Sequence, residues 1–200
     1  MIEQEIHPWK WFAPKNSEIL MIGTFPTAKR NWSFDFFYPN KANLFWSVMA
    51  RIMKQELKHF SGENAVEERR NILESLNIAI TDMGFEIMRK EGSSLDEMLV
   101  PIQYMEIFQI LQENPTINKI ILTSSSGPVS ASRWFVEYLK RKNIKHVFPK
   151  GLKPLSSHFQ FEDRTIKLII LHSPSRRAAN RISFDKLVEM YEHEIISPVT

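Results

Sequence analysis

The chain has 200 residues, of which 43% are hydrophobic, 12% aromatic and 24% charged. This length and composition fit one globular domain with its own core, and they exclude disordered, collagen-like and low-complexity chains. The absence of cysteine excludes disulfides, thiolate metal sites, iron–sulfur clusters and cysteine nucleophiles. A net charge of +3, from 26 Lys and Arg against 23 Asp and Glu, is too small to identify a partner by itself.

The N-terminus and the hydropathy pattern favour a soluble protein of the cell interior. Residues 1–5 are acidic, whereas a secretory signal begins with basic residues and continues with an apolar run. No apolar run approaches the ~20 residues that cross a bilayer, so we expect a cytoplasmic protein without a membrane partner. The six histidines have no ligand-like spacing, and we therefore expect no metal.

The first half of the chain predicts two buried strands and two helices. After an aromatic N-terminal arm, residues 1–17, short apolar runs that stop at a glycine or an aspartate predict strands at 18–23 and 77–82. Apolar residues that recur every three or four positions predict helices at 43–53 and 67–76. The loop between the first strand and the first helix is rich in aromatic residues.

The second half continues to alternate between strands and helices. Pro128 fits the first turn of a helix, and Ser183 fits an N-cap. The expected elements are a helix within 95–112 that is interrupted near Pro101, a strand at 118–123, a helix at 129–142, a weaker strand at 144–148, a strong strand at 165–171 and a helix from Ser183 to Glu194.

This alternation predicts an α/β fold. We expect one domain over residues 1–200, a three-layer α/β/α sandwich with a four-stranded, mostly parallel central sheet. Ligands of such sheets bind at the carboxyl ends of the strands. The loops that begin near Gly23, Asp82, Ser124 and His172 should therefore share one rim.

Four segments in these loops and the first helix resemble a known superfamily in their order. They are Gly23–Pro26, Phe37–Pro39, Asn43–Trp46 and Leu171–Arg177. The combination resembles the uracil-DNA glycosylase superfamily, and within it the hypoxanthine-DNA glycosylase branch and its mismatch-specific relatives. The resemblance covers about 17–181 and implies an enzyme that cleaves the bond between a damaged base and deoxyribose in DNA, without a metal or cofactor.

An enzyme of this kind must flip a nucleotide into a pocket, stack the base and read its edge. Aromatic rings can supply the stacking faces, although plain core packing is the alternative role for each ring. The base-binding residues that the resemblance implies are Gly23, Thr24, Phe25, Pro26, Phe37, Tyr38 and Ser124.

Asn43 and Asp82 are the expected catalytic residues. Asn43 stands where the hypoxanthine branch has its catalytic asparagine, and an amide can accept a bond from water and donate one to a base. The alternative role of Asn43 is an N-cap. Asp82 stands where related enzymes contact the base; when ionised it would accept a ring N–H, and its alternatives are holding a water or capping the next segment.

The DNA-binding residues belong to the loop after the last strand and to the first loop. Hydroxyls and backbone amides contact phosphates, and basic side chains supply the charge. The expected set is Lys29, Arg30, His172, Ser173, Pro174, Ser175, Arg176, Arg177 and Arg181. His172 lies one residue after the position of the catalytic histidine of the uracil enzymes, so we assign it no catalytic role.

Two departures from the superfamily pattern leave alternatives open. Phe25 stands where the strongest uracil enzymes carry an acidic residue, and Thr81 replaces a bulkier residue. One alternative is therefore a nucleic-acid-binding protein of this fold that has lost catalysis. Another is a phosphosugar-binding isomerase or sensor that holds a phosphate on the Ser124–Gly127 loop at a helix N-terminus. We expect the glycosylase to act on DNA as a monomer.

Overall fold

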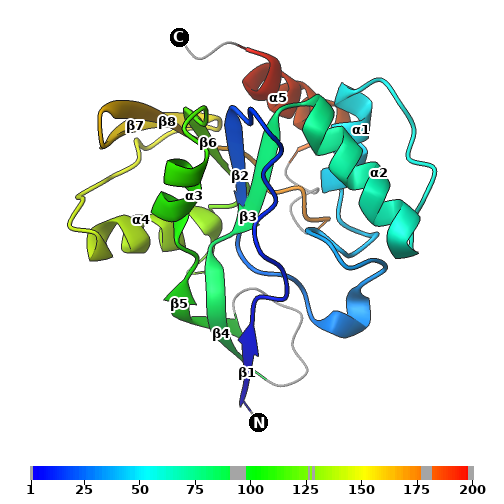
Figure 1. The fold of residues 1–200 in the computed structure, drawn as a ribbon, viewed down its shortest axis with the longest axis horizontal. Coiled ribbons are helices and arrows are strands. Elements are labelled where there is room, and N and C mark those ends of the chain that lie inside the picture. Colours follow the sequence, from blue (N-terminus) through cyan, green and yellow to red (C-terminus); the bar gives the residue numbers. More distant parts are fainter. Residues whose placement is uncertain (1, 91–97, 126, 128, 177–181, 198–200) are drawn as a thin grey trace.

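The structure, a computed structural model, describes residues 2–90, 98–125, 127, 129–176 and 182–197, which form two sheets with helices around them (Figure 1). The main sheet has the strand order β3-β2-β6-β8-β7, and the small sheet has the order β1-β4-β5. The strands are β1 (Ile2–Ile6), β2 (Ile19–Gly23), β3 (Ile78–Asp82), β4 (Gly84–Lys90), β5 (Leu99–Tyr104), β6 (Lys119–Leu122), β7 (Leu155–Phe161) and β8 (Arg164–Ile170). The helices are η1 (Lys29–Asn31, a 3-10 turn), α1 (Phe45–Ile52), α2 (Gly62–Ser75), α3 (Ile107–Glu113), α4 (Ala131–Arg141) and α5 (Phe184–Ile196).

Four strands of the main sheet run parallel, and a fifth joins them in the opposite direction. The parallel pairs are β3 with β2, β2 with β6 and β6 with β8, whereas β7 is antiparallel to β8. Every residue of β2, β3 and β6 is buried, as expected for strands that are covered on both faces. The predicted fold class is confirmed, and the antiparallel edge strand is the part that the prediction lacked.

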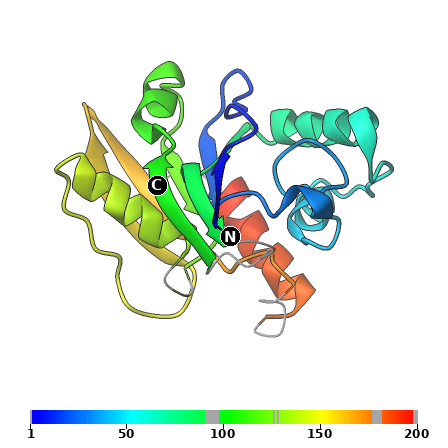
Figure 2. The ribbon, with the colours of Figure 1, turned by 90° about the horizontal axis from the view of Figure 1, so that it is seen from below.

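Helices cover both faces of the main sheet, which gives the three layers seen in Figures 1 and 2. Leu20 and Ile22 of β2 pack with α3 and α4 on one face. Ile19 and Met21 pack with α1, α2 and α5 on the other. Both cores draw on the same strand because successive side chains of a strand point to opposite faces. The main sheet therefore separates two hydrophobic cores, one on each face.

The small sheet begins where β3 ends. β4 starts two residues after the end of β3, and β1 and β5 pair with it on either side, both antiparallel. In Figure 1 this sheet lies below the main sheet, with the N-terminus at its lower end. The predicted N-terminal arm thus contains a paired strand that lies close to the carboxyl edge of β3.

One expected element is confirmed only in part, and another is wrong. The helix expected within 95–112 is present but begins only at Ile107, because residues 99–104 form the edge strand β5, where Pro101 is tolerated. Residues 144–148 form no strand. The edge strand is instead β7, in which more exposed and more buried side chains alternate. This pattern differs from the continuous apolar runs that predicted the buried strands.

The predicted helices at 129–142 and after Ser183 are confirmed. α4 spans Ala131–Arg141, and Ser183 caps α5 by accepting a hydrogen bond from the Lys186 amide. Within the described ranges, no helix has the length and apolar character needed to cross a membrane.

A buried lysine fixes the end of the last helix against the main sheet. Lys119, the first residue of β6, is 1% exposed, and its Nζ donates to the carbonyl oxygens of Glu194 (2.7 Å) and Ser197 (2.9 Å). The last carbonyls of a helix lack partners within the helix. Burial lowers the pKa of Lys119, and the two carbonyl oxygens compensate part of that desolvation.

Replacing Lys119 with methionine should destabilise the fold by about 1–3 kcal/mol, because buried carbonyl oxygens lose their donor. Equilibrium urea unfolding gives this difference in the free energy of unfolding. The control is Lys186→Met on the exposed surface of α5, which should change that free energy by less than about 0.5 kcal/mol. Equal losses in the two variants would contradict the anchoring role of Lys119.

Candidate functional site

Gly23 and Asp82 end neighbouring parallel strands and lie directly against each other. They are register partners in the β2–β3 pair. A Cβ atom added to Gly23 would lie 2.0 Å from Asp82 Oδ1 and 3.0 Å from the Tyr38 hydroxyl. The missing side chain at position 23 therefore provides the space that the Asp82 carboxylate occupies.

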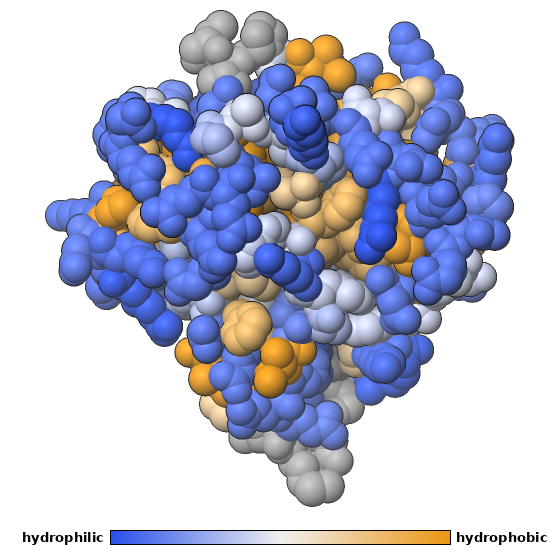
Figure 3. Space-filling model, viewed as in Figure 1, coloured by the Kyte–Doolittle hydropathy of each residue, from blue (hydrophilic) through white to orange (hydrophobic). Residues whose placement is uncertain are grey.

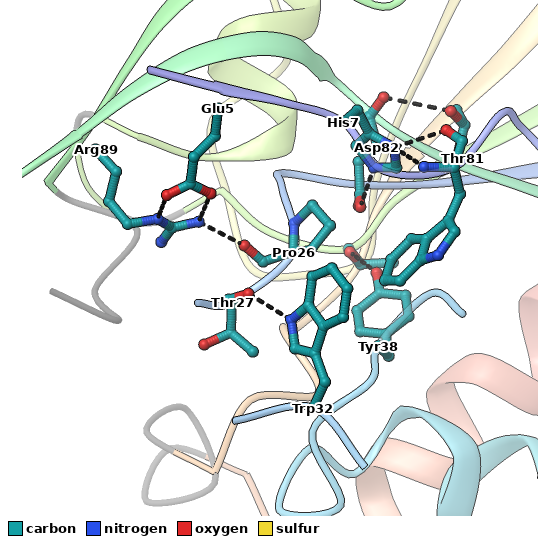
Figure 4. Close-up of polar contacts among 11 residues, drawn as sticks. Glu5, His7, Pro26, Thr27, Trp32, Tyr38, Thr81, Asp82 and Arg89 are labelled. Atoms are coloured by element: carbon teal, nitrogen blue, oxygen red, sulfur yellow. Dashed lines mark hydrogen bonds and ion pairs between the residues drawn. The ribbon is translucent and has the colours of Figure 1, made fainter. Parts of the chain in front are cut away.

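His7 contacts the other oxygen of the same carboxylate (Figure 4). Its Nε2 lies 3.1 Å from Asp82 Oδ2, and its Nδ1 lies 2.7 Å from the Trp9 carbonyl oxygen. The His7 side chain has no exposed surface and that of Asp82 is 7% exposed. The rings of Trp9, Phe25 and Phe37 lie 5.4 to 5.7 Å from the imidazole, centroid to centroid.

Sequence reasoning missed His7 as a site residue. Its position in an aromatic arm was visible, but no local pattern links residue 7 to residue 82. The contact arises because β1 pairs with β4 and the His7 amide donates to the Phe85 carbonyl oxygen at 2.7 Å. The signal is thus the non-local pairing of an N-terminal strand, which periodicity does not reveal.

The segment after β2 is held by contacts from the small sheet. Arg89 of β4 donates to the Pro26 carbonyl oxygen at 2.8 Å and forms a two-bond ion pair with Glu5 of β1 (Figure 4). Phe25 packs closely against Gly84, where an added Cβ would lie 2.8 Å from its ring. The predicted base-binding residues Phe25 and Pro26 are both buried in this state.

Hydroxyl groups join the segment after β2 to the end of β6. Thr24 Oγ1 lies 3.1 Å from Ser124 Oγ, and the Tyr38 hydroxyl lies 2.7 Å from Thr123 Oγ1. The Tyr38 ring stacks on Phe45 with centroids 4.0 Å apart. These contacts bring predicted base-binding residues from three separate segments to one edge of the sheet.

Asn43 stands two residues before α1 and lies beside the loop that follows β8. Its Oδ1 accepts a hydrogen bond from the amide of Phe45, the first residue of α1, at 2.9 Å, so its side chain caps that amide although Leu44 holds the N-cap position. The next amide, of Leu44, donates to the Pro174 carbonyl oxygen at 2.9 Å. The two predicted motifs, more than a hundred positions apart, therefore meet in the structure.

The loop after β8 is tied to the last helix and carries an exposed cation. The His172 carbonyl oxygen accepts a bond from the Tyr191 hydroxyl at 2.9 Å, and burial raises the pKa of Tyr191, which keeps it a neutral donor. Ser173 Oγ accepts a bond from the Ser175 amide at 3.2 Å. Arg176 is exposed.

The remaining predicted DNA-binding residues fall into two groups. Lys29 and Arg30 form the exposed turn η1. Arg177 and Arg181 lie outside the described residues.

The amides at the start of α4, which would have to hold the phosphate considered above, already donate to partners in the protein. The Ala131 amide donates to Ser124 Oγ at 2.9 Å and the Ser132 amide to the Ser124 carbonyl oxygen at 3.1 Å. The Arg133 amide donates to Ser130 Oγ at 3.4 Å. Because these amides already have partners in the protein, the phosphosugar interpretation loses its main donors.

The rim formed by Gly23, Asp82 and Phe37 is closed by its own side chains. Phe37 has no exposed surface, and Gly23 is buried. A cavity of about 270 Å³ lies nearby between η1 and the start of α2, lined by Lys29, Trp32, Ser33, Phe34, Asp35, Gly62, Glu63 and Val66. Among the described side chains, no group of three His, Asp or Glu residues is arranged to hold a metal ion.

Comparisons with known proteins identify the fold. No family model matches the chain, and no curated protein matches it in sequence. Its structure is similar to the solution NMR structure of a "putative Uracil DNA glycosylase" from Methanosarcina acetivorans, with a TM-score of 0.61 and 16% sequence identity over 98% of this chain and 100% of that one. The two chains share one fold. At this identity the likeness concerns the fold alone.

Replacing Gly23 with alanine should displace the Asp82 carboxylate and lower the free energy of unfolding by about 1–3 kcal/mol, the usual cost of overpacking. The loss should be smaller when the same substitution is made in an Asp82→Ala background, because the obstructing oxygen is then absent. Urea unfolding of the two single variants and the double variant measures this coupling. Additive losses would contradict a direct clash between positions 23 and 82.

Proposed function

We propose that this protein is a DNA glycosylase that flips a deaminated base, hypoxanthine or uracil, out of DNA and hydrolyses its N-glycosidic bond. The observation that carries the proposal is the bond from the Leu44 amide to the Pro174 carbonyl oxygen. It brings the segment of Asn43 to the Ser173–Ser175 loop, at the sheet edge where Asp82 lies over Gly23. The full-length likeness to a structure described as a uracil DNA glycosylase supports the same reading.

The reaction requires few groups from the protein. Water adds to C1′ of the deoxyribose, the bond from C1′ to the base nitrogen breaks with its electron pair on the base, and the proton lost by the water balances the leaving base. A donor and acceptor such as the Asn43 amide can steady the water and the developing charge. An ionised Asp82 can accept N1–H of hypoxanthine or N3–H of uracil.

The closed rim places a condition on this proposal. A flipped base needs the volume that buried rings such as Phe25 and Phe37 occupy in the described state. Entry therefore requires side chains of the aromatic loop to shift when DNA binds, a change common among interface side chains. The exposed cations Lys29, Arg30 and Arg176 would contact the phosphates on either side.

A catalytically inactive nucleic-acid-binding protein is the second candidate function. The observation in its favour is Phe25, a buried apolar residue at the position where the strongest uracil enzymes carry an acid. Both candidates predict DNA binding, so the release of a base separates them.

Incubation with labelled duplex and single-stranded oligonucleotides that carry inosine, uracil, xanthine or mismatched thymine should generate abasic sites in at least one substrate. Alkaline cleavage of the product strands makes those sites visible on a denaturing gel. Unmodified oligonucleotides of the same sequence are the control. Binding of these oligonucleotides without any cleavage would contradict the enzyme proposal and favour a nucleic-acid-binding protein without catalysis.

Asn43→Asp separates the two roles of Asn43, because aspartate keeps the capping oxygen and loses the amide donor. We expect this variant to keep its thermal midpoint and to lose roughly 100-fold in single-turnover rate, the usual effect of removing one donor to a developing charge. Asn43→Ala, which removes both groups, should lose stability as well. If the Asn43→Asp enzyme is fully active, Asn43 has only the capping role.

A further inference from the structure

The buried contact between His7 and Asp82 has no part in the chemistry proposed so far. His7 comes from the segment that follows β1, far in sequence from the motifs of the rim, yet its ring contacts the carboxylate at the end of β3. We propose that His7 is a positioning residue whose Nε2–H donates to Asp82 Oδ2 and holds the carboxylate in the orientation that reads the flipped base. This role rests on the proposed function.

The contacts of the two ring nitrogens fix the orientation of His7. The Trp9 amide donates to Nδ1 at 3.2 Å, and the Trp9 carbonyl oxygen lies 2.7 Å from the same nitrogen. Nε2 is thereby directed at the Asp82 carboxylate.

The contact between Nε2 and Asp82 Oδ2, at 3.1 Å, gives two buried groups a hydrogen-bond partner. A carboxylate oxygen accepts, so the ring nitrogen is the donor. Burying polar groups costs little when each of them has such a partner.

This pairing divides the two oxygens of Asp82 between two tasks. Oδ2 is engaged by His7, and Oδ1 lies over Gly23, in the place that a Cβ atom there would take. Oδ1 is therefore the acceptor that remains for a ring N–H. Without His7, the carboxylate would be free to rotate, and the acceptor would no longer have a fixed direction.

The other groups around His7 leave Asp82 as the side chain that receives its Nε2–H. Glu5, on the preceding strand β1, is paired with Arg89 of β4. The side chains that contact the ring from the aromatic segments are Trp9, Phe25 and Phe37, all uncharged. Loss of the His7 ring should therefore act mainly through Asp82.

Two substitutions test the role of His7 in the full-length chain. His7→Phe keeps a packed ring without an N–H, whereas His7→Gln keeps an N–H donor that does not titrate. We expect His7→Phe to lower the single-turnover rate by about 10- to 100-fold, as supporting partners of functional groups commonly do, and His7→Gln to recover part of it. Affinity for an oligonucleotide with an abasic-site analogue should stay within about 3-fold, because the phosphate contacts remain.

Rescue by His7→Gln and a double variant distinguish positioning from a merely structural role. His59→Phe, on an exposed histidine before α2, is the matched control and should not change the rate. In an Asp82→Asn background, His7→Phe should cost no further rate. Multiplicative losses would show that His7 acts independently of Asp82 and overturn the proposal.

A measurement without substrate separates this inference from the proposed function. In histidine-labelled protein, ¹⁵N NMR should show a hydrogen on Nε2 of His7, and Asp82→Asn should change the Nε2 signal. A His7 ring without a hydrogen on Nε2 in the wild type would overturn the hydrogen bond to Asp82 even if the enzyme is active. If the wild type releases no base from any substrate, the proposed function fails, and the NMR result alone decides whether His7 holds Asp82.

Discussion

The close approach of Asp82 to Gly23 sets the geometry of the carboxyl edge. The two residues are partners in a parallel register, and the carboxylate occupies the space where a β-carbon at position 23 would lie. One oxygen is thereby turned toward the end of β2 and the other toward the N-terminal arm. The neighbouring Tyr38 hydroxyl reaches the same place from the aromatic loop. Three distant parts of the chain thus depend on one missing side chain.

The aromatic loop between β2 and α1 takes its shape from burial rather than from regular structure. Phe34, Phe36 and Phe37 are all buried, and Trp46 donates from Nε1 to the Phe37 carbonyl oxygen at 2.9 Å. Burying one large apolar side chain contributes about 1.5–3 kcal/mol. Several such side chains can therefore order a segment that has few backbone bonds of its own. The order of this loop is what places Tyr38 against Thr123.

The parts of the structure that could be predicted are those with a local signal. Continuous apolar runs predicted β2, β3, β6 and β8, and a three- to four-residue period predicted α1. β5 and β7 are edge strands, which mix exposed and buried side chains and tolerate a proline such as Pro101. A search for continuous apolar runs therefore does not find them.

The candidate site divides in the same way. Gly23, Asp82 and Asn43 stand at the ends of predictable elements, and the structure brings each of them to the expected edge. His7 does not follow from such reasoning, because its place depends on β1 pairing with β4 about eighty positions later. Non-local pairing of this kind has no signature in the local sequence.

Buried polar groups at the two edges of the main sheet have different tasks. At the amino edge of the main sheet, buried Lys119 serves carbonyl oxygens that the last helix leaves unpaired, which is a structural task. At the carboxyl edge, His7 and Asp82 are buried in contact with each other, although apolar side chains of similar volume can be as stabilising as a buried polar pair. Buried polar groups that gather at the edge where α/β sheets bind their ligands are the pattern expected of a functional site.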